Sequence, residues 1–329
     1  MALRAVPVSW PHGITARPLE KNDVQAWADL LAAREQVDQG GEHYTSEDLL
    51  EELENPQLEL SRDTVGLWAD GQLVGFGQMY PQTTIFDVDR QGGQGAVHPA
   101  WRRRGLGTAL MEWLIHRAGE LHLANHPDSP GEVRCSTIST NAGAVQLFRG
   151  LGFEETRYFL DMKRPLDEPV PAFDVPEGFR LAPFDREYDE ALRLTHNEVF
   201  RDHWGSTPRD PQSWQSTVIG TRAFRPELSY LVLEGETIAA YVLGYEYVAD
   251  VEATGVREAH VGRVGTRREY RGRGLARVAL AEVLAESARA GFQRAGLGVD
   301  ADGATGALGL YEGLGFGVHS KWITFSRAL

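Results

Sequence analysis

Apolar and polar positions follow the same order in the two halves of the chain. Each half opens on a short run of strand type, at residues 13–19 and 178–184, and continues with a stretch in which apolar residues recur at helical spacing. Two apolar runs separated by a tight turn come next, which is typical of a β-hairpin. The paired runs lie at residues 65–69, 73–80, 230–233 and 237–247, with turns at Asp70, Gly71, Glu234 and Gly235.

The remainder of each half predicts a strand, a turn rich in arginine and glycine, a long helix, a second strand, a short helix and a last strand. Between the halves, residues 164–178 hold four prolines, which fit neither a helix interior nor a paired strand. One element order repeated on both sides of such a segment indicates a duplicated domain. The pattern predicts a first domain at residues 1–164, a linker at 165–177 and a second domain at 178–329.

Length and composition agree with two folded domains, because the chain has 329 residues, of which 42% are hydrophobic and 24% charged. No run approaches the roughly 18 apolar residues of a membrane helix, and residues 1–11 lack the apolar core of a secretory signal. We therefore expect a cytoplasmic protein. The single cysteine, Cys135, can form no intramolecular disulfide, and its strand-like surroundings predict a small core residue rather than a nucleophile.

Charge narrows the range of partners. The formal net charge is −14, which argues against nucleic acid or an anionic membrane surface as a partner. It mildly favours a cationic substrate, although an acidic surface that only keeps a protein in solution explains it equally well. We expect neither a nucleic acid nor a membrane partner.

The turn rich in arginine and glycine is the chemically informative motif. Residues 102–107 and 271–276 both read Arg-x-x-Gly-x-Gly/Ala and lead directly into a long helix. Unpaired N–H groups and partial positive charge at a helix start attract anions, and small residues allow a diphosphate to approach the backbone. Neither copy has the Gly-Lys-Ser/Thr ending of a nucleotide-triphosphate loop or the dinucleotide fingerprint G-x-G-x-x-G, which disfavours a kinase or a dehydrogenase.

With these motifs the chain resembles the GNAT superfamily of N-acetyltransferases, over nearly its whole length and twice. The resemblance implies an α/β (α+β) fold of two tandem domains, each a mixed, twisted sheet flanked by helices. It also implies acetyl-CoA as acetyl donor and no metal, with the pyrophosphate at the turn and the pantetheine arm at the end of the preceding strand. The implied cofactor-binding residues are Val264, Gly265, Thr266, Arg271, Gly272, Arg273, Gly274, Leu275 and Ala276 in the second half, and Ala96, Val97, Arg102, Arg103, Arg104, Gly105, Leu106, Gly107 and Asn141 in the first.

The resemblance also implies a general acid in the second half alone. Tyr311 stands in a stretch that resembles the family's L-Y-x-x-x-G-F, in which the tyrosine protonates the departing CoA thiolate. The first half has Phe148 at this position, and a phenylalanine has no proton to donate. Conversely, the first half keeps an asparagine common in the family, Asn141, whereas the second half has Ala304.

A base is needed because an amine with a pKa near 10 is mostly protonated at neutral pH. The family often carries the base on the fourth strand. Counting back eleven residues from Arg271 reaches His260, and Glu258 lies on the same face of a regular strand. Either residue could act, directly or through water. The same count from Arg102 reaches Gln91, in a stretch without titratable side chains, so the first half is expected to be catalytically impaired.

The expected activity is transfer of an acetyl group to a primary amine of a small molecule such as an aminosugar or an antibiotic. The tandem arrangement is similar to that of a two-domain family member that acetylates a cysteinyl aminosugar. A protein lysine or N-terminal acetyltransferase, and a non-catalytic acetyl-CoA-binding regulator, remain alternatives, and Tyr311 argues against the second. We expect a monomer or a homodimer. Candidates for contact with the substrate are His196, Asp202, His203, Trp204, Tyr245 and Glu246.

Overall fold

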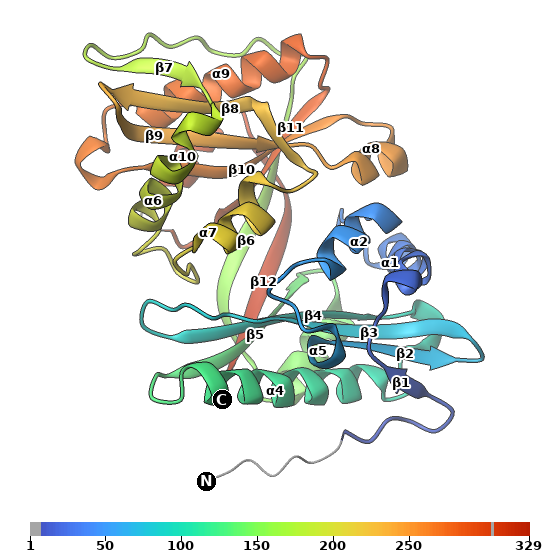
Figure 1. Ribbon diagram of the computed structural model, residues 1–329. Coiled ribbons are helices and arrows are strands. Elements are labelled where there is room, and N and C mark those ends of the chain that lie inside the picture. Colours follow the sequence, from blue (N-terminus) through green and yellow to red (C-terminus); the bar gives the residue numbers. More distant parts are fainter. Residues whose placement is uncertain (1–7, 304–305) are drawn as a thin grey trace. The chain divides into compact units, whose positions relative to one another are not determined.

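The computed structural model describes residues 8–303 and 306–329. They pack into two compact units (Figure 1). Unit 1 ends at Arg157 and also takes in Trp322–Leu329, and unit 2 comprises Tyr158–Lys321. Each unit is a mixed sheet flanked by helices, which confirms the α/β fold of two similar domains.

The sheet of unit 1 follows the order β1-β2-β3-β4-β5-β12. All neighbours are antiparallel except β4 and β5, which are parallel. The hairpin predicted at Asp70 and Gly71 is confirmed, with φ angles of 48° and 79° that suit a tight two-residue turn. The strands are β1 (Thr15–Arg17), β2 (Thr64–Ala69), β3 (Gln72–Tyr80), β4 (Asp89–Val97), β5 (Gly131–Ile138) and β12 (Gly317–Ala328).

Unit 2 repeats this arrangement with the order β6-β11-β10-β9-β8-β7, and here β10 and β11 form the parallel pair. The second predicted hairpin joins β8 to β9 at Gly235, whose φ is 58°. The strands are β6 (Glu154–Pro165), β7 (Arg180–Pro183), β8 (Phe224–Glu234), β9 (Thr237–Tyr245), β10 (Glu258–Thr266) and β11 (Arg294–Asp300).

Helices cover both faces of each sheet, and alternation along the strands fills both cores (Figure 1). In unit 2, Val242 of β9 packs in the core beneath α9, whereas Tyr241 and Leu243 pack in the core beneath α6 and α7. The helices are α1 (Val24–Asp38), α2 (Ser46–Leu53), α3 (Leu60–Asp63), α4 (Leu106–Asn125), α5 (Ala142–Gly150), α6 (Asp189–Val199), α7 (Pro211–Trp214), α8 (Val248–Thr254), α9 (Leu275–Arg289) and α10 (Ala307–Glu312).

The last strand of each sequence repeat joins the sheet of the other unit. Strand β12, from the second repeat, pairs with β5 in unit 1 over Trp322–Ala328, and β6, from the first, pairs with β11 in unit 2 over Phe159–Pro165. The packing therefore divides after Arg157 and after Lys321, whereas the division into residues 1–164, 165–177 and 178–329 follows the order of the repeats. A strand can pair with any open sheet edge, so the boundary of a sequence repeat does not predict which sheet its last strand joins.

The segment expected to be a linker belongs to unit 2. Residues 166–177 form no helix or strand, as their prolines predict. The neighbouring Arg164 is 2% exposed and donates hydrogen bonds to the carbonyl oxygens of Leu314, at 2.6 Å, and Pro169, at 3.0 Å. The segment is therefore held against the unit at its start.

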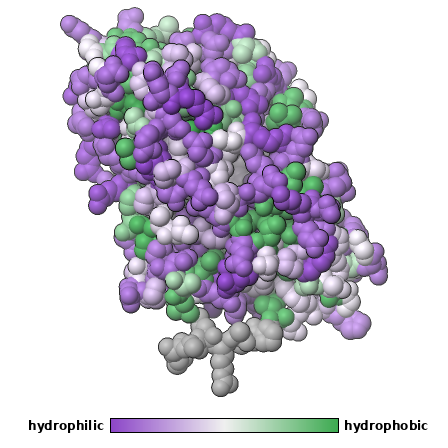
Figure 2. Space-filling model, viewed as in Figure 1, coloured by the Kyte–Doolittle hydropathy of each residue, from purple (hydrophilic) through white to green (hydrophobic). Residues whose placement is uncertain are grey.

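Surface and core agree with the composition. In the view of Figure 2, hydrophilic residues cover most of the visible face of each unit, with apolar residues in scattered groups. Cys135 is 5% exposed in β5, and burial raises its pKa to about 12, so the prediction of a core residue is confirmed. Among the described residues, none of the helices is both long and apolar enough to cross a membrane.

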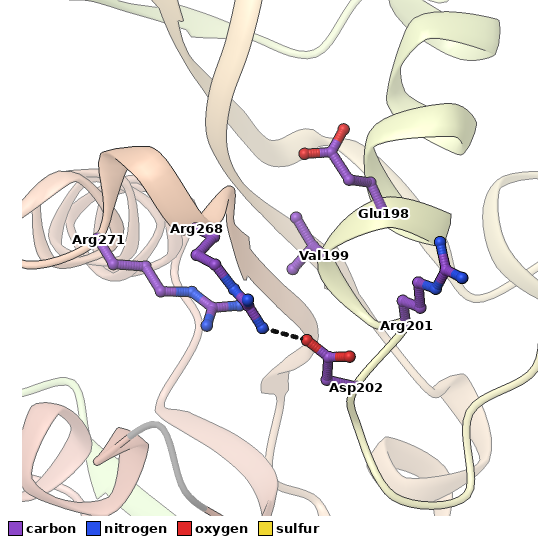
Figure 3. A pocket seen from close by; sticks show the side chains of 6 residues that line it. All are labelled: Glu198, Val199, Arg201, Asp202, Arg268 and Arg271. Carbon is purple, nitrogen blue, oxygen red and sulfur yellow. Dashed lines mark hydrogen bonds and ion pairs between the residues drawn. The ribbon is translucent and has the colours of Figure 1, made fainter.

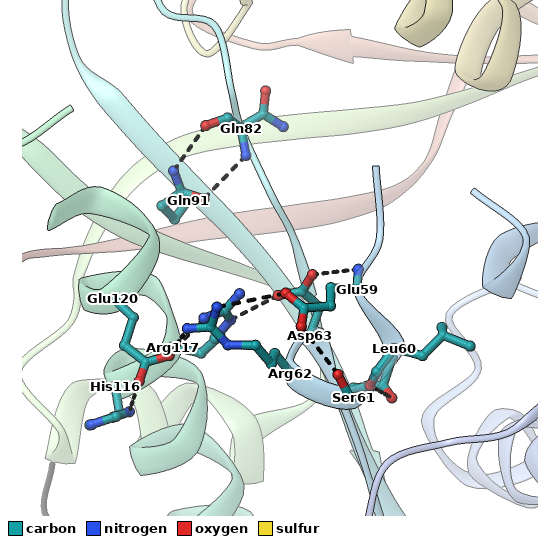
Figure 4. Close-up of polar contacts among 11 residues, drawn as sticks. Glu59, Leu60, Ser61, Arg62, Asp63, Gln82, Gln91, His116, Arg117 and Glu120 are labelled. Atoms are coloured by element: carbon teal, nitrogen blue, oxygen red, sulfur yellow. Dashed lines mark hydrogen bonds and ion pairs between the residues drawn. The ribbon is translucent and has the colours of Figure 1, made fainter. Parts of the chain in front are cut away.

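A buried ion pair holds α3 to α4 in unit 1 (Figure 4). Asp63 accepts a hydrogen bond from Nε of Arg117 at 2.8 Å, and the two side chains are 2% and 6% exposed. The Arg117 guanidinium also donates to Glu120 at 2.7 Å, which Arg62 approaches from the surface at 3.4 Å. Removing one member would leave the other charged and desolvated inside the protein.

We expect Arg117→Met to lower the free energy of unfolding by about 3–5 kcal/mol, because Asp63 loses its buried partner. Equilibrium unfolding in urea, followed by circular dichroism, measures the change. Arg62→Ala removes an exposed partner of the same cluster and should lower it by less than about 1 kcal/mol. Equal losses in the two variants would contradict a dominant role of the buried pair.

Candidate active site

In each unit the parallel strand pair separates partway along its length. Strand β10 pairs with β11 only from Glu258 to Val261, and β4 pairs with β5 only from Asp89 to Gly92. Beyond these positions β11 and β5 continue to pair with β6 and β12 on their other edges. The ends of β10 and β4 therefore present backbone N–H and C=O groups without a strand partner on that side, as a ligand that binds backbone requires.

A β-bulge at Gly262 distinguishes the two units. The register between β9 and β10 shifts by one residue between Val261 and Arg263, whereas β3 and β4 stay in one register throughout. A Cβ at Gly262 would collide with the ring of Tyr245 across the strands, so glycine is required there. The sequence contains this glycine, but sequence reasoning missed the bulge, because register is a property of the paired strands.

The bulge changes which side chains share a face. His260 lies opposite Tyr245 and Arg263 opposite Leu243, and both partners pack in the core beneath α6 and α7. Residues three apart on a regular strand point to opposite faces. The extra residue at Gly262 therefore brings His260 and Arg263 to the same face.

The turn before α9 has the geometry of an anion site. Gly272 and Gly274 have φ angles of 76° and 79°, and no atom lies within 4 Å of where a Cβ would stand on either. Nε of Arg271 donates to the carbonyl oxygen of Thr266 at 3.2 Å, which fixes the turn to the end of β10. The first N–H groups of α9, at Leu275 and the residue after it, begin directly behind this open space.

A pocket of about 370 Å³ opens beside this turn (Figure 3). Arg268 and Arg271 reach into it from the turn, and Glu198, Val199, Arg201 and Asp202 line it from the end of α6. Asp202, a sequence candidate for substrate contact, forms an ion pair with Arg268, while Arg271 has no carboxylate partner in the described chain. Arg271 therefore presents a guanidinium without a carboxylate partner in the described chain next to the glycine turn.

The turn of unit 1 has the same course but less free charge and space. Arg103 occupies the position of Gly272 with φ of 63°, a strained conformation for a residue with a Cβ. Nε of Arg102 donates to the carbonyl oxygen of Val97 at 3.3 Å, and its terminal nitrogens bind both oxygens of Asp38, at 2.7 and 2.8 Å. An internal carboxylate thus neutralises the arginine that corresponds to Arg271.

Asn141 contacts the same carboxylate. Its Nδ2 donates to Asp38 at 3.2 Å, and its Oδ1 accepts from the N–H of Ala144 at the start of α5. Ala304, the corresponding residue of the second half, lies outside the described residues. Arg104 stacks over Trp101 at 4.6 Å beside the turn, and the side chains of Leu106 and Ala96 are buried in the core.

Tyr311 and Phe148 occupy corresponding positions. Tyr311 is 7% exposed and stands edge-on to Phe316 at 6.1 Å, as Phe148 stands beside Phe153 at 6.0 Å. Burial raises the pKa of Tyr311 to about 12, so the phenol keeps its proton at neutral pH. Within the described chain its hydroxyl forms no hydrogen bond, and it is not among the fully enclosed polar atoms that lack a partner.

The two candidate bases differ sharply in their surroundings. Glu258 is 7% exposed and binds Lys163 at 2.7 Å and Arg294 at 2.5 Å. Burial alone would raise the Glu258 pKa, but the two cations outweigh it and the pKa is lowered. His260 is half-buried against the Tyr247 ring, at 5.4 Å, and makes no hydrogen bond in the described chain. Its geometry suits a base better than that of Glu258, which is held in a structural ion cluster.

Burial lowers the pKa of His260 to about 4; the charge of Glu258 opposes this shift, and the charges of Lys163 and Arg263 add to it. The imidazole is therefore neutral at pH 7 and able to accept a proton. His196 lies on the same face, is 6% exposed, and forms a hydrogen bond between its Nδ1 and the Tyr241 hydroxyl at 2.8 Å. Burial, followed by the charge of Arg263, lowers its pKa to about 3.

The remaining candidates for substrate contact have structural partners. Nδ1 of His203 contacts the carbonyl oxygen of Trp204 at 3.1 Å. Tyr245 is buried beneath the bulge. Glu246 accepts from Arg225 at 3.0 Å and from Arg257 at 2.6 Å, which lowers its pKa against the effect of burial.

Unit 1 contains a carboxylate, Glu52, that the count of residues along the fourth strand does not predict. Gln91 is fully buried and bonds to Asp89 at 2.6 Å and to the backbone of Gln82 (Figure 4). Glu52, from α2, accepts from the Tyr80 hydroxyl at 2.7 Å, and from Gln78 and Gln94. Burial raises the pKa of Glu52. The residue comes from a helix, so strand periodicity contains no signal for it.

The fold and the paired turns define a class of protein. Residues 190–316 match the profile of the acetyltransferase (GNAT) family, and residues 62–155 match that of a GNAT acetyltransferase domain. The chain belongs to the GNAT acetyltransferases, with two GNAT domains in tandem, and is an acyltransferase.

Among its relatives is the mycothiol acetyltransferase of Thermobispora bispora, which is 31% identical over 78% of this chain and 79% of the relative. That of Salinispora arenicola is 30% identical over 97% and 98%. A GCN5-related N-acetyltransferase from Sphaerobacter thermophilus has a similar structure, with a TM-score of 0.78 and 28% identity over 97% of both chains. A tandem GNAT protein from the clavulanic acid biosynthesis pathway shares the fold, with a TM-score of 0.69, 18% identity and coverage of 96% and 98%.

We expect Gly265→Ala to weaken CoA binding by about tenfold or more, because the new methyl group would collide with the Tyr241 ring and displace the end of β10. Titration calorimetry with CoA measures the change. Gly317→Ala, an exposed strand position with no neighbouring atom within 4 Å, is the control. Unchanged affinity in Gly265→Ala would show that CoA does not use this strand end.

His196 and His260 should make the folded protein less stable as the pH is lowered. Their pKa values in the folded protein, about 3 and about 4, lie below the ordinary 6.5, so below pH 6.5 only the unfolded chain takes up these protons. The free energy of unfolding in urea should be highest above pH 6.5 and fall toward pH 4. The variant His196→Gln should show a smaller fall. Stability that rises from pH 7 to pH 5 would contradict the argument.

Proposed function

We propose that the protein is an acetyl-CoA-dependent N-acetyltransferase whose second domain transfers the acetyl group directly to a primary amine of a small molecule. The observation that carries the proposal is the open glycine turn at Gly272 and Gly274, fixed to the separated end of β10 by Arg271. The names of the mycothiol acetyltransferase relatives support a small-molecule acceptor. Identity near 30% leaves the particular amine to experiment.

In the proposed mechanism, acetyl-CoA supplies a thioester carbonyl that an amine attacks. His260 accepts the proton of the attacking amine, since its imidazole is neutral at pH 7. Backbone N–H groups near Val264, Gly265 and Thr266 donate to the negative charge that develops on the carbonyl oxygen. The new C–N bond forms as the C–S bond breaks. Tyr311 gives its proton to the departing thiolate and regains one through solvent.

The chemistry of Tyr311 suits this role. A thiol has an ordinary pKa of about 8.5, so a free thiolate at neutral pH readily takes a proton. Burial raises the pKa of Tyr311 to about 12, so the phenol is protonated at neutral pH and can act as the donor to the sulfur while the C–S bond breaks. The low exposure of Tyr311 and the lack of a hydrogen-bond partner for its hydroxyl in the described chain support this role.

We propose that the first domain does not carry the reaction. Phe148 cannot donate a proton, β4 has no bulge, and Asp38 neutralises Arg102. Calorimetry with CoA separates two roles for this domain. Two equivalents bound would indicate that its turn still holds the cofactor, and one equivalent would indicate a scaffold.

We expect Tyr311→Phe to lower kcat by about 10²-fold while leaving the affinity for CoA unchanged, because the variant loses only the proton donor. Release of CoA thiol from acetyl-CoA, measured across a panel of amines, gives the rate. Tyr188→Phe, which removes a hydroxyl that accepts a hydrogen bond from Arg180, is the control and should keep the wild-type rate. Full activity in Tyr311→Phe would overturn the proposed acid, and no thiol release from the wild type with any amine would overturn the proposed function.

A further inference from the structure

Arg263 is a half-buried cation without an anionic partner. The bulge turns it to the face of the sheet that α6 and α7 cover, which it shares with His260. Its guanidinium donates one hydrogen bond, to the carbonyl oxygen of Gly262 at 2.7 Å. The same charge lowers the pKa values of His196, His260 and Arg209, so its field reaches all three. Most of its N–H donors are left for another group.

Arg209 lies on a firmly held loop directly before α7, which packs over the face of the sheet that carries Arg263. Both its backbone N–H and its carbonyl bond to the side chain of Asn197, at 2.8 and 2.9 Å, and the carbonyl also accepts from Arg193 at 2.6 Å. The guanidinium donates to the buried Ser213 hydroxyl at 3.2 Å. Burial and the charge of Arg263 both lower the pKa of Arg209. The protein therefore holds this cation where its charged form is disfavoured.

Two arginines elsewhere in the described chain have carboxylate partners. Arg117 has Asp63, and Arg102 has Asp38. Arg164 has no carboxylate but donates to several carbonyl oxygens. A desolvated guanidinium without such partners is unfavourable, and it persists where a ligand of opposite charge binds.

Carboxylates on neighbouring elements are engaged elsewhere. Asp210 accepts the N–H of Ser213 at 2.7 Å and caps α7, and it is the carboxylate that acts on Arg209. Glu258 is held by Lys163 and Arg294, and Glu198 pairs with Arg267 at 3.2 Å. Within the described chain, no carboxylate lies within ion-pair distance of Arg209 or Arg263.

Building on the proposed function, we propose that the acceptor amine of unit 2 carries an anionic oxygen group, a carboxylate or a phosphate, which Arg209 and Arg263 bind. Guanidinium groups bind both anions through paired N–H donors. The group would lie on the face that carries His260, so one molecule can present its anion to the arginines and its amine to the base. The positive charge also disfavours the ammonium form of the acceptor and thus favours the nucleophilic amine.

Two pairs of acceptors test this proposal and distinguish the two anions. Glucosamine and glucosamine 6-phosphate differ by a phosphate, and β-alaninamide and β-alanine differ by a carboxylate. The anionic member of at least one pair should have a kcat/KM at least about tenfold higher with the wild type, mainly through KM. Arg209→Gln and Arg263→Gln should each remove most of that preference, measured as the ratio of the two kcat/KM values within a pair, and leave CoA affinity unchanged.

Arg289→Gln changes the net charge by the same amount on the exposed side of α9, where Arg289 pairs with Glu282, and should keep the preference. Calorimetric binding of the same amines to CoA-saturated protein gives a readout that does not need turnover. Equal kcat/KM and equal affinity within both pairs would overturn the anion site, even if acetyl transfer occurs. Anion-selective binding without any thiol release would support the site and overturn the proposed function.

Discussion

The divergence of one parallel strand pair in each unit is the constraint on which the rest of the structure depends. Strand β11 pairs with β10 only over Arg294–Leu297, whereas on its other edge it pairs with β6 along its whole length. In unit 1, β12 pairs in the same way with the other edge of β5. The exchanged strands complete both sheets, so each sheet takes its last strand from the other repeat. The separated edges of β10 and β4 are then free for a ligand.

The two units share one architecture but differ in the charges around the glycine turn. In unit 2 the glycine turn is open and Arg271 has no carboxylate partner in the described chain, whereas in unit 1 Asp38 binds the corresponding Arg102. The bulge at Gly262 adds a second difference, because it aligns His260 with Arg263 on one face. The two units therefore differ in strand register and in local charge, in addition to the tyrosine that the first half lacks.

The net charge of the chain differs in sign from the charge of the arginines near His260. The chain carries −14, which mildly favours a cationic substrate, yet Arg263 shares the face of His260, and Arg209 is bonded to α7, which packs over that face. Charges separated by more than about 10 Å are largely screened at moderate salt, so the distant acidic surface has little effect at this site. The carboxylates of Glu258, Glu198 and Asp210, on neighbouring elements, are already bonded to other groups.

The sequence by itself determined the two domains, the hairpins, the glycine turns, and the contrast between Tyr311 and Phe148, because each depends on local periodicity or on the identity of one residue. It could not determine which sheet receives β6 or β12, since pairing is settled by an open edge elsewhere in the fold. Nor could it show that Lys163 and Arg294 hold Glu258, or that Arg209 is bonded to Ser213 of α7. Burial, strand register and the partners of each charge are properties of residues distant in sequence, and only the tertiary structure brings them together.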